Sequence, residues 1–129
     1  MPTPNDRSFV LVVEDEGLIR LVLSEALMGA GFAIVEADSA EEAVRALSGG
    51  RKIGAVVTDI RMPGAMDGIG LCRWMREHTP DTPIIATTGF ADLDEANKVN
   101  PAVIEVVAKP YPPEELAERV AKLLRRILP

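Results

Sequence analysis

The stretch Ala55-Val56-Val57-Thr58-Asp59-Ile60-Arg61-Met62-Pro63-Gly64 is an apolar, β-branched run that ends at a single carboxylate, with a proline and a glycine soon after it. Such a run predicts a buried strand, and the proline and glycine predict a turn. In an open α/β sheet, ligands bind beyond the carboxyl ends of the strands. The pattern therefore predicts that Asp59 lies at the edge of a sheet, within reach of a ligand.

Four other apolar runs have the length of a strand, and helical spacing follows each run. We expect strands at residues 9–13, 33–37, 55–59, 83–89 and 103–108. We expect helices that begin near Gly17, Ser39, Asp67 and Pro112, and a weaker helix between Asp92 and Val99. Strands that alternate with helices predict parallel βαβ units with helices on both faces of the sheet. The predicted fold is therefore α/β, a doubly wound five-stranded parallel sheet with five helices over residues 9–128, after an N-terminal arm of residues 1–8.

Local signals predict how several helices begin, end and pack. Gly29 or Gly31 is expected just past the first helix, and Ser39 with Glu42 predicts a capping box at the second. The first helix should bury an apolar stripe formed by Leu18, Val22, Leu23, Ala26 and Leu27. The last helix should bury Leu116, Val120, Leu123 and Ile127.

Composition and charge exclude several classes of protein. The chain has 129 residues, 47% hydrophobic and 26% charged, which is typical of one globular domain. A net charge of −6 argues against nucleic acid or an anionic membrane as a direct partner. The single cysteine, Cys72, excludes an internal disulfide and fits a reducing compartment. No apolar run reaches the roughly 18 residues of a membrane span and no signal peptide is apparent, so we expect a cytoplasmic protein.

Polar residues follow four of the predicted strands at the same end. Glu14 and Asp15 follow the first strand, Asp59 ends the third, Thr88 lies at the end of the fourth and Lys109 follows the fifth. Three carboxylates about 4 Å apart would repel one another by roughly 4 kcal/mol per pair at an effective dielectric constant of 20. A hard divalent cation such as Mg²⁺ would relieve that repulsion.

A carboxylate, a metal, a lysine and a hydroxyl are the groups that phosphoryl transfer needs, because its catalysis consists mainly of positioning and of neutralising charge. Asp59 would attack phosphorus in line and form an acyl phosphate. Mg²⁺ and the amine of Lys109 would each bind a phosphoryl oxygen. The hydroxyl of Thr88, with backbone N–H groups, would hold a third.

Five motifs occur in order on successive parts of the chain: Val12-Val13-Glu14-Asp15-Glu16, Asp59-Ile60-Arg61-Met62-Pro63, Met66-Asp67-Gly68, Thr88-Gly89 and Lys109-Pro110. Together they resemble the response-regulator receiver domain of two-component signalling, from about Phe9 to the end of the last helix. The resemblance implies a flavodoxin-like (βα)5 fold with the strand order 2-1-3-4-5. It implies that Asp59 accepts a phosphoryl group from a sensor histidine kinase or a histidine phosphotransfer protein.

The resemblance also implies a set of metal ligands. Asp15 and Asp59 would ligate Mg²⁺ directly, and Mn²⁺ can take its place. Glu14 would act largely through a metal-bound water. The backbone carbonyl of Arg61 would be a further ligand.

The last two predicted strands would carry the conformational switch. Thr88 and Lys109 would sense the phosphoryl group, and the peptide bond between Lys109 and Pro110 would be cis. Receivers commonly have Tyr or Phe three residues before this lysine, whereas this chain has Val106. We hypothesise that Tyr111, the only tyrosine, takes the place of that ring. The loop at residues 62–68 is a second departure, since it holds one more residue than is usual.

The protein would not act on a separate substrate as an enzyme does. It would catalyse only its own phosphorylation and slow dephosphorylation, which would switch its binding to a downstream protein that the sequence does not identify. The resemblance implies a phosphorylation-dependent homodimer through the last two helices and the fifth strand. Residues 86–91 match in part a subfamily of stand-alone receivers, so the chain is either such a receiver or a piece of a longer protein.

Two other functions stay open. An aspartate-nucleophile phosphohydrolase of the haloacid-dehalogenase type would place Asp-x-Asp after its first strand, where this chain has Glu14-Asp15-Glu16, and it would need a cap. A receiver-like interaction module without phosphorylation would not need the complete set of acids. Taken singly, Asp59 could be a turn or cap residue. We expect His78 to be a solvated helix-end residue rather than a phosphodonor, and Cys72 to be a small core residue.

Overall fold

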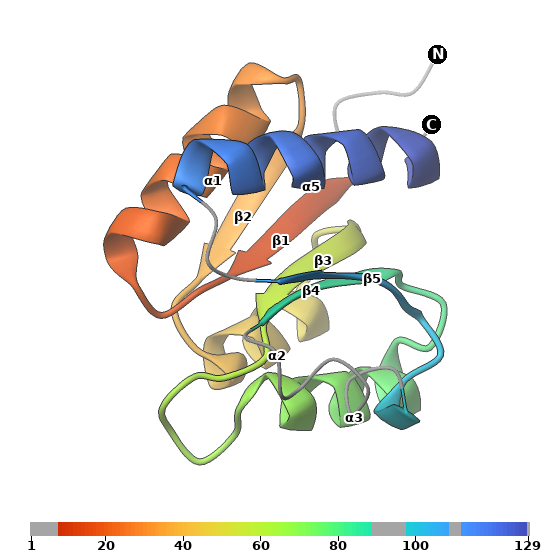
Figure 1. The fold of residues 1–129 in the computed structure, drawn as a ribbon. Helices are drawn as coiled ribbons and strands as arrows, with labels where there is room; N and C mark the ends of the chain where they lie inside the picture. Colours follow the sequence, from red (N-terminus) through yellow and green to blue (C-terminus); the bar gives the residue numbers. More distant parts are fainter. Residues whose placement is uncertain (1–7, 89–97, 109–111, 129) are drawn as a thin grey trace.

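The computed structural model describes residues 8–88, 98–108 and 112–128. Its strands form one parallel sheet in the order β2-β1-β3-β4-β5 (Figure 1). They are β1 (Phe9–Val13), β2 (Ala33–Ala37), β3 (Ile53–Asp59), β4 (Ile84–Thr88) and β5 (Val103–Ala108). The predicted strand order is confirmed.

Two of the described helices cover each face of this sheet (Figure 1). They are α1 (Gly17–Gly29) and α5 (Pro113–Ile127) on one face, and α2 (Ala40–Ser48) and α3 (Gly68–His78) on the other. The doubly wound α/β class is therefore confirmed. Of the helix expected between Asp92 and Val99, residues 98–99 are helical and the rest lies outside the described residues. Within the described ranges, the structure contains no helix that could cross a membrane.

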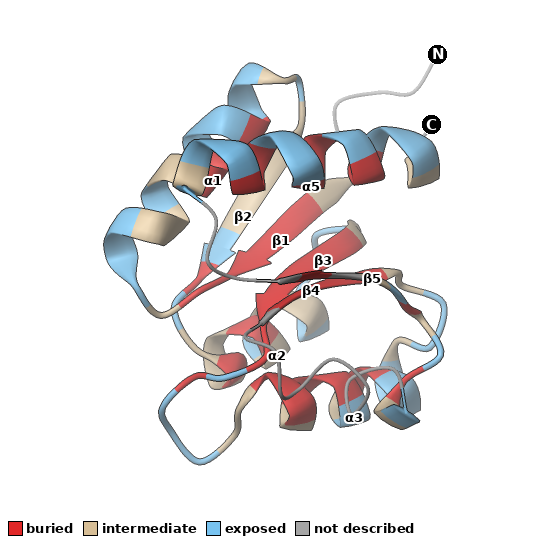
Figure 2. Ribbon diagram, viewed as in Figure 1, coloured by how far each residue is buried: buried red, intermediate tan, exposed pale blue. Residues whose placement is uncertain are grey.

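Alternate residues of the central strands face two separate hydrophobic clusters. On β1, Leu11 and Val13 pack in the cluster beneath α2 and α3, whereas Val10 and Val12 pack in the cluster beneath α1 and α5. Figure 2 shows burial along nearly all of β1 and β3. Strands covered on both faces need apolar residues at every position, which is why these runs are continuous rather than alternating.

The predicted helix ends are largely confirmed. Gly31 has a φ of +102°, as expected for the residue just past the end of α1. The hydroxyl of Ser39 accepts a hydrogen bond from the N–H of Glu42 at 3.1 Å. The Glu42 carboxylate accepts from the N–H of Asp38 at 3.2 Å, so the reciprocal bond of the capping box goes to the residue before the expected one.

Two strand boundaries differ from the prediction. β3 begins at Ile53, two residues before the predicted start, and its pairing with β1 shifts register around Gly54. A glycine in a strand weakens the sequence signal and often marks such an irregularity. β4 begins at Ile84 rather than Pro83, and Gly89 lies outside the described residues.

The buried stripe predicted for α1 is wrong at two positions. Leu18 is 73% exposed and Ala26 is also exposed, whereas Leu23, Ser24 and Leu27 are buried. α1 packs against α5 as well as against the sheet, which turns this narrower face inward. Leu18 lies in the first turn of α1, where the described part of the chain leaves it uncovered.

Ser24 offers a test of what burial of a hydroxyl costs. Its Oγ is buried and has no hydrogen-bond partner among the described residues. An unsatisfied buried polar group costs about 1–3 kcal/mol. We expect Ser24→Ala to raise the free energy of unfolding by about 1 kcal/mol, measured by urea denaturation. Ser48→Ala, at the exposed end of α2, is the control for helix propensity, and an equal gain in both variants would contradict the explanation.

Candidate functional site

Asp59 is the last residue of β3 and lies at the carboxyl edge of the sheet. It is only 7% exposed. Its Oδ1 accepts a hydrogen bond from the N–H of Arg61 at 3.1 Å. The next residue, Ile60, donates its N–H to the carbonyl of Thr87 at 3.0 Å, so the sheet ladder continues past Asp59. A nearly buried carboxylate is thus mounted on a rigid central strand.

The register of the sheet brings the end of β1 beside Asp59. Val13 pairs with Thr58, so Glu14 and Asp59 each lie one residue beyond that pair. The N–H of Glu14 donates to the carbonyl of Ala37 at 3.1 Å. Glu14 is 3% exposed, and Asp15 is the most exposed of the three acids.

The carboxylates of Glu14, Asp15 and Asp59 form one group, which we call the acidic cluster. One oxygen of each lies within 4.8 Å of an oxygen of the other two. Buried charges of one sign at this spacing are unfavourable unless a cation balances them. The donors are all carboxylate oxygens, which suit hard divalent ions such as Mg²⁺ and Mn²⁺. The three predicted acids do lie together, and they fit such an ion; which of them ligate it stays a prediction.

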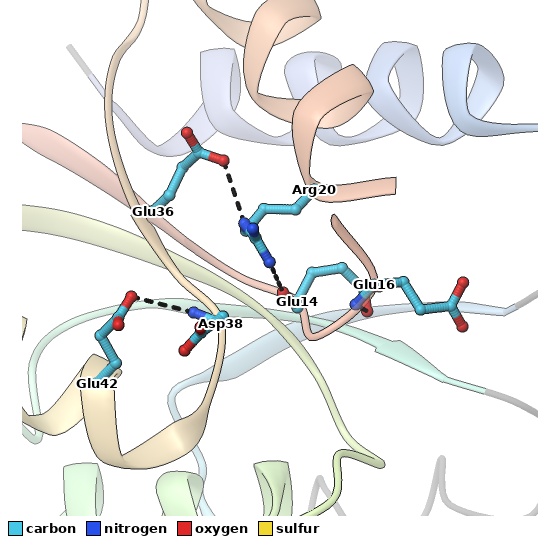
Figure 3. Close-up of polar contacts among 6 residues, drawn as sticks. All are labelled: Glu14, Glu16, Arg20, Glu36, Asp38 and Glu42. Atoms are coloured by element: carbon cyan, nitrogen blue, oxygen red, sulfur yellow. Dashed lines mark hydrogen bonds and ion pairs between the residues drawn. The ribbon is translucent and has the colours of Figure 1, made fainter. Parts of the chain in front are cut away.

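Arg20 connects the acidic cluster to β2 and α1 (Figure 3). Its Nη1 donates to the main-chain carbonyl of Glu14 at 2.8 Å, and its Nε lies 3.3 Å from Oε1 of Glu36. The carboxylate of Glu14 accepts a further bond from the N–H of Glu16 at 3.1 Å. Arg20 is not among the site residues predicted from the sequence. An arginine one helical turn after an acidic run is the signal that could have indicated it.

The loop after β3 packs tightly against the backbone of Asp59. Gly68 donates its N–H to the carbonyl of Ile60 at 2.9 Å. A Cβ on Gly68 would overlap the carbonyl oxygen of Asp59 and lie 2.6 Å from the Cα of Ile60. Asp67 caps α3 by accepting a bond from the N–H of Gly70 at 2.9 Å. Only glycine therefore fits at position 68.

The loop at residues 62–68, which is one residue longer than is usual in receivers, is hydrogen-bonded to a side chain of α2. Oε1 of Glu41 accepts a hydrogen bond from the N–H of Met66 at 3.1 Å. Gly64 has a φ of +120°, and a Cβ built there would lie 3.5 Å from Oε1 of Glu41. Arg61 and Asp67 form an ion pair across the loop at 3.6 Å. Glu41 has no predicted role in the sequence, because an acid in the first turn of a helix is already explained by the helix dipole.

For the remaining predicted site residues, the structure describes either the backbone alone or neither backbone nor side chain. Thr88 ends β4 and pairs with Ala108, the last residue of β5 and the residue that precedes Lys109 in the sequence. The side chains of Thr88 and Val106, and all of Lys109, Pro110 and Tyr111, lie outside the described residues. Their predicted roles stay predictions.

Cys72 and His78 lie where the sequence predicts them, in the core and at an exposed helix end. Cys72 is buried in the core, where burial and then the negative charge of Asp67 raise the pKa of its thiol to about 12. His78 is exposed at the end of α3, stacks on Trp74 with ring centroids 4.4 Å apart, and contacts the Trp74 carbonyl through Nδ1 at 2.9 Å. Neither belongs to the acidic cluster.

Comparison with known proteins gives consistent matches. The family described as "Response regulator receiver domain" matches residues 10–121. Among solved structures, the response regulator protein TrrA from Thermotoga maritima, in complex with Mg²⁺ and BeF, is 35% identical with a TM-score of 0.73, and the match covers 91% of this chain and 99% of that one. A response regulator receiver protein from Pseudomonas putida is 36% identical with a TM-score of 0.75, covering 90% and 97% of the two chains.

Curated relatives are longer than this chain. It is 36% identical over 118 residues to the probable transcriptional regulator ycf27 of Guillardia theta, a match that covers 91% of this chain and 45% of the relative. It is 34% identical over 122 residues to the DNA-binding transcriptional regulator NtrC of Escherichia coli K12, covering 94% of this chain and 25% of that protein. The chain thus spans about half or less of the length of these relatives.

Proposed function

Because the chain belongs to the response regulator receiver domain family, we propose that residues 9–128 accept a phosphoryl group on Asp59 in a reaction that requires Mg²⁺. The observation that carries the proposal is the acidic cluster, in which Asp59 lies with Glu14 and Asp15 at one edge of the sheet. The solved relative TrrA holds Mg²⁺ and BeF, and it matches this chain over nearly its whole length. That relative supports Mg²⁺, with Mn²⁺ as a substitute, as the ion to test here.

The proposed reaction transfers a phosphoryl group from the imidazole nitrogen of a phosphohistidine. A carboxylate oxygen of Asp59 attacks phosphorus in line, the phosphorus–nitrogen bond breaks, and an acyl phosphate forms on Asp59. Bound Mg²⁺ supplies positive charge that neutralises the phosphoryl oxygens. Asp15 and Asp59 would hold that ion directly with the backbone carbonyl of Arg61, and Glu14 would act largely through a metal-bound water. Lys109 and Thr88 contact the phosphoryl oxygens.

The proposed partners follow from the same chemistry. Receiver domains are phosphorylated by histidine kinases, and the donor here is a sensor histidine kinase or a histidine phosphotransfer protein. Phosphorylation adds about 1.5 to 2 negative charges, which biases the arrangement of the segments around Thr88, Val106 and Tyr111. That change alters binding to a downstream protein, or formation of a homodimer through α5, β5 and the helix that includes residues 98–99.

A single assay separates this function from the two alternatives. The purified chain is incubated with Mg²⁺ and acetyl phosphate, and its intact mass is followed with time. We expect one phosphoryl group per chain that persists after the donor is removed, and no adduct when EDTA is present. Rapid turnover of the donor without a lasting adduct would favour the phosphohydrolase. A chain that binds no phosphoryl group in Mg²⁺ would favour the interaction module.

A further inference from the structure

Glu14 fixes the turn that carries the acidic cluster, because its N–H, its carboxylate and its carbonyl each form a hydrogen bond. Its N–H donates to the carbonyl of Ala37, which fixes it to β2. Its carboxylate accepts a bond from the N–H of Glu16 at 3.1 Å. Its carbonyl accepts a bond from Nη1 of Arg20 at 2.8 Å. The first two bonds use neighbouring main chain, whereas the third depends on one long side chain.

The guanidinium of Arg20 is itself fixed in place. Its Nε lies 3.3 Å from Oε1 of Glu36 on β2, so α1, the end of β1 and β2 are joined through one planar group (Figure 3). The side chain of Arg20 is 24% exposed, which is less than the 43% of Glu36. An arginine can make two such directed contacts at once, whereas a lysine ammonium acts as a single point charge.

Two effects of Arg20 on a bound cation have opposite signs. As a positive charge beside the carbonyl of Glu14, it repels a divalent cation in the acidic cluster, so its removal should tighten binding. As a support for the turn, it holds the main chain that leads from Glu14 to Asp15, so its removal should weaken binding. Groups that orient metal ligands typically contribute about 10–100-fold to metal affinity. The sign of the change therefore tells the two effects apart.

We propose that Arg20 is a positioning residue for the divalent-metal site, acting through the main chain of Glu14, and that this effect outweighs its repulsion of the ion. The proposal rests on the proposed function, because it takes the acidic cluster to be the metal site. It concerns the apo protein and its affinity for Mg²⁺, before any phosphoryl group is present.

The test is an equilibrium titration of the full chain with Mg²⁺ alone, in which calorimetry measures the Kd. We expect Arg20→Ala to raise the Kd for Mg²⁺ about 10-fold or more. Arg20→Lys should recover only part of that loss, since it keeps the charge and loses one of the two directed contacts. Glu36→Gln should weaken binding less than Arg20→Ala, because the bond to the Glu14 carbonyl remains.

Arg119 provides a matched control. Its Nη2 lies 3.3 Å from Oε1 of Glu105, so Arg119→Ala removes the same charge and an ion pair of the same length between α5 and β5. We expect that variant to bind Mg²⁺ with a Kd within twofold of the parent. Thermal unfolding without Mg²⁺ identifies the fraction of each variant that is folded, to which the titrations are normalised.

The outcomes are distinct. A Kd for Arg20→Ala that is unchanged or lower than the parent value would overturn the proposal, since repulsion would then dominate or the support would be irrelevant. Equal weakening in Arg119→Ala would overturn it too, because the effect would be one of general charge or stability. A parent chain that binds no Mg²⁺ at all would instead contradict the proposed function.

Discussion

Asp59→Asn is expected to abolish phosphorylation by acetyl phosphate, because an amide cannot attack phosphorus as a carboxylate does. Asp15→Asn keeps the nucleophile and removes one oxygen donor from the acidic cluster, where the three acids lie within 4.8 Å of one another. Losing one group that stabilises transition-state charge typically costs about 100- to 1,000-fold in rate. We therefore expect slow phosphorylation of Asp15→Asn on the same aspartate, measured by intact mass with time and by peptide mapping.

Asp59→Asn and Asp15→Asn should also change the stability of the protein. Without Mg²⁺ they should stabilise it, although they impair phosphorylation. Two like charges about 5 Å apart repel by roughly 3 kcal/mol at an effective dielectric constant of 20. Without Mg²⁺, neutralising Asp59 should therefore raise the midpoint of urea unfolding, and added Mg²⁺ should then stabilise the variant less than it stabilises the parent.

Asp81→Asn is the control for these variants, because Asp81 is an exposed acid in the turn between α3 and β4. It should leave the phosphorylation rate and the effect of Mg²⁺ unchanged. A phosphoryl group found on the Asp59→Asn variant would show that the acceptor lies elsewhere.

Gly68→Ala is expected to destabilise the domain by about 3 kcal/mol, at the upper end of what overpacking usually costs. The new Cβ would overlap the carbonyl oxygen of Asp59 and lie 2.6 Å from the Cα of Ile60, and both obstacles are backbone. The loop would have to move away from β3, so phosphorylation should also slow in the fraction that remains folded. Urea denaturation and the phosphorylation assay measure the two effects.

Gly29 provides the matched control, since it is the last residue of α1 and nothing lies within 4 Å of a Cβ built there. Gly29→Ala should stabilise the protein by about 0.5–1 kcal/mol, because alanine loses less conformational freedom in a helix. Equal effects at the two glycines would show that the contact between Gly68 and Asp59 is not the cause.

The sequence predicted the fold well because the fold depends on patterns that repeat locally. Continuous apolar runs such as Val10 to Val13 predict strands that are buried on both faces. The polar residues after these runs predict one edge of a parallel sheet. The sequence pattern failed to predict burial where burial depends on which other elements pack against a helix. Leu18 has the spacing of a core residue, but it lies in a turn of α1 that no described element covers.

The meeting of Glu14, Asp15 and Asp59 was also predictable, because parallel strands in register bring equivalent positions together. The supports of that site were not. Arg20 and Glu41 act on main-chain groups, through the carbonyl of Glu14 and the N–H of Met66. Any residue can offer such a group, so a charge pattern can draw attention to Arg20, but only the folded geometry identifies the main-chain group that it contacts.

The central place of β3 has a consequence for how this domain can tolerate change. Its residues contribute to both hydrophobic clusters, with Val56 on one side and Ala55 and Val57 on the other. A substitution in that strand would disturb packing above and below the sheet together, and would shift Asp59 at its tip. Variation should therefore accumulate at the outer strands and exposed helix faces, while β3 and the position of Asp59 are retained.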